Sequence, residues 1–78
     1  MAEKQLFAVV TFHTTTEAMH MESAAKAAGF GGRLIPVPRI ISAGCGLAWR
    51  ESIEDRDKLE QFMKAEEIEC DAIHEIEL

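Results

Sequence analysis

The sequence predicts an α+β sandwich, and three observations predict it. Segments typical of strands and helices follow one another in the order β-α-β-β-α-β over residues 5–78, with short connections. Residues 5–13 are apolar on both parities, which is typical of a central strand. Pro36 lies in the second strand segment and has no N–H to give to a ladder, so this strand belongs at a sheet edge. Right-handed crossovers then predict a ferredoxin-like fold, a four-stranded antiparallel sheet with two helices on one face and strand order fourth, first, third, second.

The first half of the chain carries clear signals for a strand and a helix. Residues 5–13 are rich in β-branched and aromatic side chains. Thr14 fits a helix N-cap, and Glu17, three residues later, fits the partner position of a capping box. Gly29 fits a left-handed C-cap with Phe30 as its hydrophobic contact. One apolar stripe recurs along this helix at three- and four-residue steps: Ala18, Met21, Ala25 and Ala28.

The second half predicts two further strands and a second helix after the edge strand at 33–37. Residues 46–50 form the third strand, in which we expect Trp49 in the core or in a dimer interface. Ser52 fits the cap of the second helix, with Asp55 at the reciprocal position. Residues 70–78 alternate and predict the fourth strand, whose acidic side chains suit an edge. The buried stripe of the second helix is expected to be Leu59, Phe62 and Met63.

Length and composition limit the function classes. The 78 residues make a single domain, 1–78, and the net charge of −6 argues against nucleic-acid binding. No stretch approaches the ~20 apolar residues of a membrane span, and no signal peptide begins the chain, so we expect a cytoplasmic protein. Two cysteines and three histidines show no metal-ligand spacing. We therefore expect neither a metal nor a cofactor.

The first strand also suggests an oligomer. One face of a ferredoxin-like sheet packs on the helices, yet Phe7 and Val9 are apolar on the other parity. An apolar strand in so small a domain suggests that a second copy covers the open face. We expect a homodimer through the sheet.

The most reactive feature of the sequence is Cys45, which lies between two glycines in the loop before the third strand. Glycines leave a thiol exposed and permit positive φ angles. The topology brings this loop to the same end of the sheet as the start of the first helix, whose free amides lower a thiol's pKa. The expected site residues are Cys45 as the thiolate, with Gly44, Gly46, Ser42, Arg39, His13, Thr14, Thr15 and Thr16 in support, and Pro36 and Pro38 stiffening the loop.

Each of these residues also has a simpler interpretation. Unpaired cysteines often act as small buried hydrophobes, and His13 can be a solvated strand end. Ser42 and Arg39 can bind an anion beside the thiol or only shape the turn. Cys70, on the alternating fourth strand, is expected to be inert and too far from Cys45 for a resident disulfide. His20 and His74 have no partner in the sequence.

The residues Val10-Thr11-Phe12-His13, Ile35-Pro36-Val37-Pro38-Arg39, Ile41-Ser42 and Cys45-Gly46-Leu47-Ala48 resemble the family of small selenium/sulfur carrier proteins, long filed as a domain of unknown function. The likeness extends from about residue 6 to residue 76. It implies a bacterial, cytoplasmic protein that handles labile selenium or sulfur on Cys45. Cys70 is not part of the motif.

Two hypotheses on function follow, and a third is less favoured. In the first, Cys45 carries sulfur or selenium as a persulfide or perselenide, as a relay more than a turnover enzyme, between protein donors and acceptors such as cysteine desulfurase-like or selenium-handling proteins. In the second, the domain is a dimeric small-molecule-sensing or regulatory module with no chemistry at Cys45. A thiol oxidoreductase is disfavoured, because no Cys-x-x-Cys pair is present.

Overall fold

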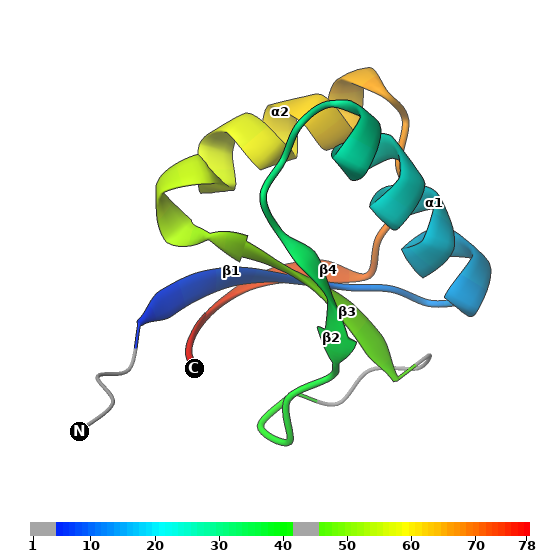
Figure 1. Ribbon diagram of the computed structural model, residues 1–78. Coiled ribbons are helices and arrows are strands. Elements are labelled where there is room, and N and C mark those ends of the chain that lie inside the picture. The colour runs from blue at the N-terminus through cyan, green and yellow to red at the C-terminus, as the bar shows by residue number, and fades with distance from the viewer. Residues whose placement is uncertain (1–4, 42–45) are drawn as a thin grey trace.

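A computed structural model describes residues 5–41 and 46–78 of the chain. Its elements follow the predicted order: β1 (Leu6–Thr11), α1 (Thr15–Ala27), β2 (Arg33–Pro36), β3 (Leu47–Ser52), the short 3₁₀ helix η1 (Ile53–Asp55), α2 (Arg56–Ala65) and β4 (Ala72–Glu77). The strands form one antiparallel sheet in the order β2-β3-β1-β4. Both helices lie on the same face of it (Figure 1). The predicted ferredoxin-like fold and strand order are confirmed, with Pro36 on the edge strand β2.

Local signals set the limits of α1. The Thr14 side chain accepts a hydrogen bond from the Glu17 N–H at 3.2 Å, as a capping threonine should. At the other end Gly29 has φ +88°, and the N–H of Phe30 reaches back to the Ala25 carbonyl at 3.0 Å. This is the left-handed C-cap that the glycine predicted.

The start of α2 differs from the prediction. Ser52 makes no side-chain capping bond, and α2 begins only at Arg56, after the turn of η1. The reason is that β3 continues to Ser52, which pairs with Phe7 of β1. Ser52 therefore stands at the N-cap position of η1, and Asp55, the predicted reciprocal residue, stands at the N-cap position of α2; neither makes a side-chain capping bond. The fourth strand is likewise shorter than expected, since it begins at Ala72 and leaves Cys70 before it.

The main core lies between the sheet and the two helices. Trp49 is fully buried there, on the helix side of β3, which places it in the core. Phe30, at the end of α1, meets Phe62 of α2 with ring centroids 5.0 Å apart. The buried members of this core are Val10, Phe12, Ala18, Met21, Ala25, Trp49, Leu59, Met63 and Ile68.

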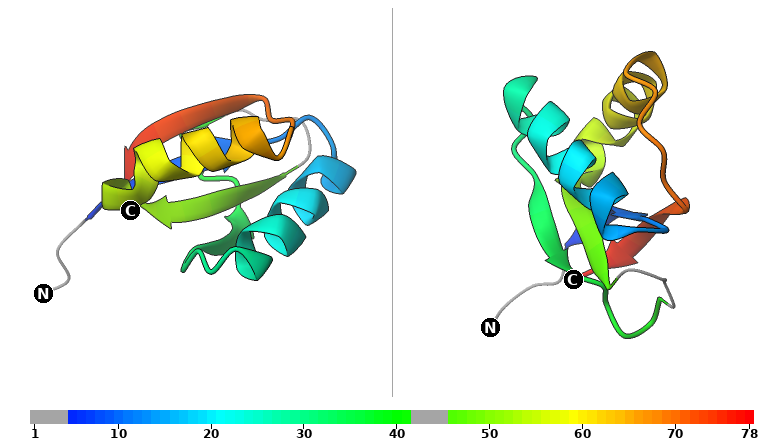
Figure 2. Two further views of the ribbon diagram at one scale, coloured as in Figure 1. Left: turned by 90° about the horizontal axis from the view of Figure 1, so that it is seen from above. Right: turned by 90° about the vertical axis from the view of Figure 1, so that its right-hand side faces the viewer.

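A second, smaller core lies on the face of the sheet away from the helices, here called the open face. Its buried residues are Val9, Ala48 and Ile76, the first two fully buried. Half-buried Val37 and Ile41 pack against them from the segment after β2, which passes on the side of the sheet opposite the helices (Figure 2). The chain therefore covers part of its own open face. The homodimer expected from this apolar strand stays a prediction, and its original reason is weaker.

Candidate functional site

The candidate site lies at the end of the sheet where β1 ends and β2 leads into the loop. The registers place Thr11 opposite both Ala48 and Ala72, so β3 and β4 begin at this end. Three residues separate the end of β1 from the start of α1, which lies at the same end of the sheet (Figure 1). The predicted meeting of the first helix, the loop and the start of the fourth strand is thus present for the residues on either side of the loop.

His13 is the centre of the polar contacts at this end. Its Nδ1 lies 3.2 Å from Oε1 of Glu17, and its Nε2 lies 3.4 Å from Oδ1 of Asp71. Glu17 belongs to the first turn of α1, and Asp71 directly precedes β4. One imidazole therefore links the start of the helix to the start of the strand.

Glu17 is bound more firmly than a surface glutamate. Its Oε1 also accepts the backbone N–H of His13 at 2.8 Å. This N–H lowers the pKa of Glu17, and the nearby His13 side chain and the Thr14 N–H lower it further. A carboxylate thus occupies the positive end of α1, where the sequence predicted free amides. Thr14, Thr15 and Thr16 are exposed, and of these Thr14 is engaged as the cap.

Thr11 extends the cluster beneath His13. This hydroxyl is fully buried and lies 3.3 Å from the Ala72 carbonyl oxygen, 3.4 Å from Asp71 Oδ2 and 3.5 Å from His74 Nε2. The backbone N–H of Asp71 donates to the Thr11 carbonyl at 2.7 Å. Asp71 is therefore held from two sides, and it presents its other oxygen to His13.

The described parts of the loop form a well-defined base. The N–H of Val37 donates to the Gly46 carbonyl at 3.0 Å, and the Ile41 N–H donates to the Pro38 carbonyl at 3.0 Å. Gly46 has φ +80°, a geometry that favours glycine. Arg39 is exposed on the turn between Pro38 and Ile41. Ser42, Gly44 and Cys45 lie outside the described residues, so their part of the site stays a prediction.

Cys70 has a free, half-buried thiol. Burial raises its pKa, and the charges of Glu17, Asp71 and Glu60 raise it further. This thiol is protonated at neutral pH, in line with the inert role expected for it. It borders a shallow hollow between α2 and β4, lined by Glu60, Met63, Lys64, Ile68, Cys70 and Ile73.

The same carboxylates bear on the predicted activation of Cys45. Glu17 and Asp71 make the described part of this end acidic, and the imidazole of His13 is already paired with both. A second thiol placed close to them would have its pKa raised, as Cys70 has. Arg39, which forms no ion pair with any described residue, is the predicted supporting group best able to favour a thiolate.

Asp71 and Thr11 were not among the site residues expected from the sequence, although Thr11 belongs to the family-like stretch Val10-Thr11-Phe12-His13. They lie 60 positions apart, so no spacing connects them. The signal that could have found Asp71 is its place directly before β4, at the end of the sheet where His13 was already expected.

Within residues 5–41 and 46–78, no three His, Cys, Asp or Glu side chains are arranged to hold a metal ion. Neither helix of the described chain is long and apolar enough to cross a membrane.

The fold defines a small ferredoxin-like α+β protein, whose sequence holds a cysteine between two glycines directly before β3. The chain belongs to the family described as "Putative Se/S carrier protein-like", which it matches over residues 7–75. The resemblance expected from the sequence is therefore confirmed. No curated protein and no solved structure matches the chain.

Proposed function

We propose that this protein carries labile sulfur or selenium as a persulfide or perselenide on Cys45. The observation that carries the proposal is membership of the Se/S carrier-like family over residues 7–75, a stretch that includes Cys45 and both flanking glycines. The partners are then proteins that donate or accept the chalcogen, of the cysteine desulfurase or selenium-handling kind. Such chemistry suits a reducing compartment such as the cytoplasm, where thiols stay reduced.

The chemical step needs only one thiolate. The Cys45 sulfur attacks the terminal sulfur of a donor persulfide, the S–S bond of the donor breaks, and the donor thiolate leaves with the electron pair. The product is a persulfide on Cys45, and no external oxidant or reductant takes part. The reverse attack by an acceptor thiolate on the terminal sulfur unloads the carrier.

The surrounding framework supports a carrier more than an enzyme. The carboxylates of Glu17 and Asp71, at the end of the sheet where β1 ends, are engaged with His13. The loop is pinned at its base by the Val37–Gly46 hydrogen bond and by the packing of Ile41 on the open face. A firm base with a glycine-flanked thiol beyond it lets the active site of a partner close over the modified sulfur.

The proposal is tested by loading the protein with sulfur. The chain is incubated with cysteine and a cysteine desulfurase, and its intact mass is measured without reductant. We expect the mass of one added sulfur atom, lost on treatment with dithiothreitol. Cys45→Ser should abolish the gain and Cys70→Ser, the matched control, should retain it. A gain that depends on Cys70, or no gain in the native chain when the desulfurase is supplied with either cysteine or selenocysteine, would overturn the proposal.

A further inference from the structure

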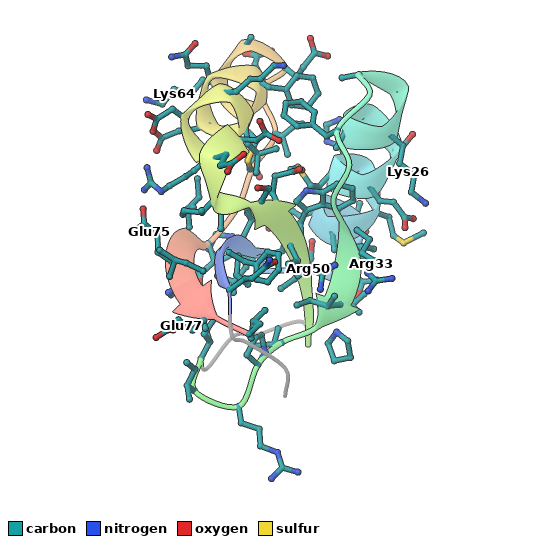
Figure 3. All side chains as sticks on the ribbon, turned by 60° about the vertical axis from the view of Figure 1, so that its left-hand side comes forward. Lys26, Arg33, Arg50, Lys64, Glu75 and Glu77 are labelled. Atoms are coloured by element: carbon teal, nitrogen blue, oxygen red, sulfur yellow. The ribbon has the colours of Figure 1, made fainter. Side chains whose placement is uncertain are left out.

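The open face of the sheet carries two arginines on neighbouring strands. Arg33 of β2 and Arg50 of β3 are paired directly in the register of the two strands. Arg50 is also opposite Val9 of β1, so all three side chains project from the open face. Figure 3 labels both arginines.

Neither arginine is neutralised within residues 5–41 and 46–78. The ion pairs of that part of the chain involve Arg56 with Glu75 and Asp57, Lys26 with Glu22, and His13 with Glu17 and Asp71. Like charges directly opposite in a sheet destabilise it. Among those described residues the two arginines therefore form an unfavourable pair, which a carboxylate from a partner would relieve.

Arg50 is already oriented for such a contact. Its Cζ lies 4.7 Å from the centroid of the Phe7 ring, a cation–π geometry that restricts the half-buried side chain. An arginine held in place loses less conformational entropy when it binds a carboxylate. Arg33 is exposed beside it.

The acidic residues of the strands avoid this face. Glu75 of β4 projects to the helix side, where its Oε2 lies 2.9 Å from Nε of Arg56, and Glu77 shares its parity. Glu51 is buried on the helix side of β3, bonded to Trp49. A chain of net charge −6 thus presents a basic sheet face.

We propose that the face bearing Arg33 and Arg50 docks a protein partner through a carboxylate-rich surface of that partner. A bidentate arginine–carboxylate contact is the pairing that this chemistry favours. The turn after β2, which includes the 79% exposed Ile40, passes on the same side of the sheet as this face (Figure 1). Docking at this face does not depend on whether Cys45 carries sulfur.

Charge disfavours two other occupants of this face, a second copy of the chain and a nucleic acid. The homodimer predicted from the sequence, if docked symmetrically through this face, would bring four arginines together with no strand carboxylate to receive them, so the proposed partner and that dimer compete for the face. A nucleic acid would meet two arginines at this face but the field of a molecule with net charge −6 beyond it. A local acidic surface on a protein meets the arginines without that extended repulsion.

The test follows the arginine side chains directly. A Cys45→Ser chain labelled with ¹⁵N-arginine is titrated at low salt with oligoglutamate, with oligoglutamine as the uncharged probe. We expect saturable shifts of the Arg33 and Arg50 Nε–H signals that weaken as salt is added. Oligoglutamine should produce none.

A matched pair of double variants separates the face from net charge. The double variant Arg33→Gln with Arg50→Gln should weaken oligoglutamate binding about tenfold or more. The control variant Lys26→Gln with Lys64→Gln removes the same charge from the helices and should retain most of the affinity for oligoglutamate. If circular dichroism shows that Arg50→Gln disturbs the fold, the Arg33→Gln variant alone and the arginine shifts in the Cys45→Ser titration still test the proposal. Equal weakening in both double variants, or no arginine shift, overturns the proposal. So does tighter binding of an oligouridylate of equal length, or a dimer that Arg33→Gln with Arg50→Gln disrupts.

Discussion

The indole Nε1–H of Trp49 donates a 3.0 Å hydrogen bond to Oε1 of Glu51, two residues further along β3 and on the same side of the sheet. Trp49 is fully buried and Glu51 is 2% exposed. A carboxylate in the interior is stable only where donors reach it, so the indole has a polar role in addition to its packing. This pair and its surroundings lead to two predictions on stability.

Replacing Trp49 should be costly for a polar reason. Trp49→Phe keeps an aromatic ring but removes the donor to Glu51, and it should lower the free energy of unfolding by about 2 kcal/mol or more. Glu51→Gln is the matched control, because it keeps an acceptor for the indole and removes the buried charge, and it should cost less. Urea unfolding measures both. A Trp49→Phe chain as stable as the native one would contradict this role for the indole.

Gly32 should tolerate no side chain. A Cβ on this residue would lie 2.2 Å from the Arg50 carbonyl oxygen and 2.7 Å from Oε1 of Glu51. The first of these is a backbone atom of the neighbouring strand, which cannot move away without breaking the β2–β3 pairing. Gly32→Ala should therefore destabilise the protein by about 1–3 kcal/mol, the usual cost of overpacking. Gly31→Ala, where a Cβ meets nothing within 4 Å, should have little effect in the same thermal or urea assay.

Glu17 should make stability depend on pH in the acid range. Its pKa is lower in the folded than in the unfolded chain, so protonation favours unfolding. The stabilisation is complete above the ordinary carboxyl range, about pH 4 to 5, and is lost as pH falls through the lower pKa of the folded state. Glu17→Gln should hence be less stable than the native chain at pH 7, and the difference should disappear once the pH falls below the pKa of Glu17 in the folded chain.

The main cause of this shift can be separated from the imidazole. The largest contribution comes from the backbone N–H of His13, which a change of side chain does not remove. His13→Gln should therefore retain most of the pH dependence. Unfolding curves at several pH values measure it, and a native chain whose stability is flat from pH 7 to the acid limit would rule out this role of Glu17.

Cys70 should react slowly with alkylating agents. In a Cys45→Ser chain its iodoacetamide rate should rise only at a pH above that of a free thiol, because burial and three carboxylates raise its pKa. Asp71→Asn should shift the rate profile to lower pH, and Asp57→Asn, whose carboxylate is not among the causes, should not. A rate profile of the Cys45→Ser chain with its midpoint at the pKa of a free cysteine, about 8.5, would exclude the raised pKa of Cys70.

Local signals predicted most of the fold. Thr14, Gly29 and Pro36 each act through one or two backbone groups close in the chain, so their roles could be inferred without the tertiary structure. Ser52 was assigned wrongly because its pairing with Phe7 depends on where β3 ends, which no local pattern marks.

Long-range contacts could not be predicted in the same way. The link between His13 and Asp71 joins residues far apart in the chain. The pairing of Arg33 with Arg50 depends on register, and a slip of one residue would turn one of them to the other face. The path of residues 37–41 across the open face follows no periodicity, so the cover it provides for Val9 was unforeseen.

Two contacts fix the ends of the segment between residues 41 and 46. Val37 donates a hydrogen bond to the Gly46 carbonyl, and Ile41 packs against the small core of the open face. The entropic cost of closing a flexible loop between two fixed ends grows only slowly with the length of the loop. An insertion between residues 41 and 46 would therefore add little closure entropy. Under the proposed function, the carrier loop could gain residues that suit a new partner while the sheet and the helices stay as they are.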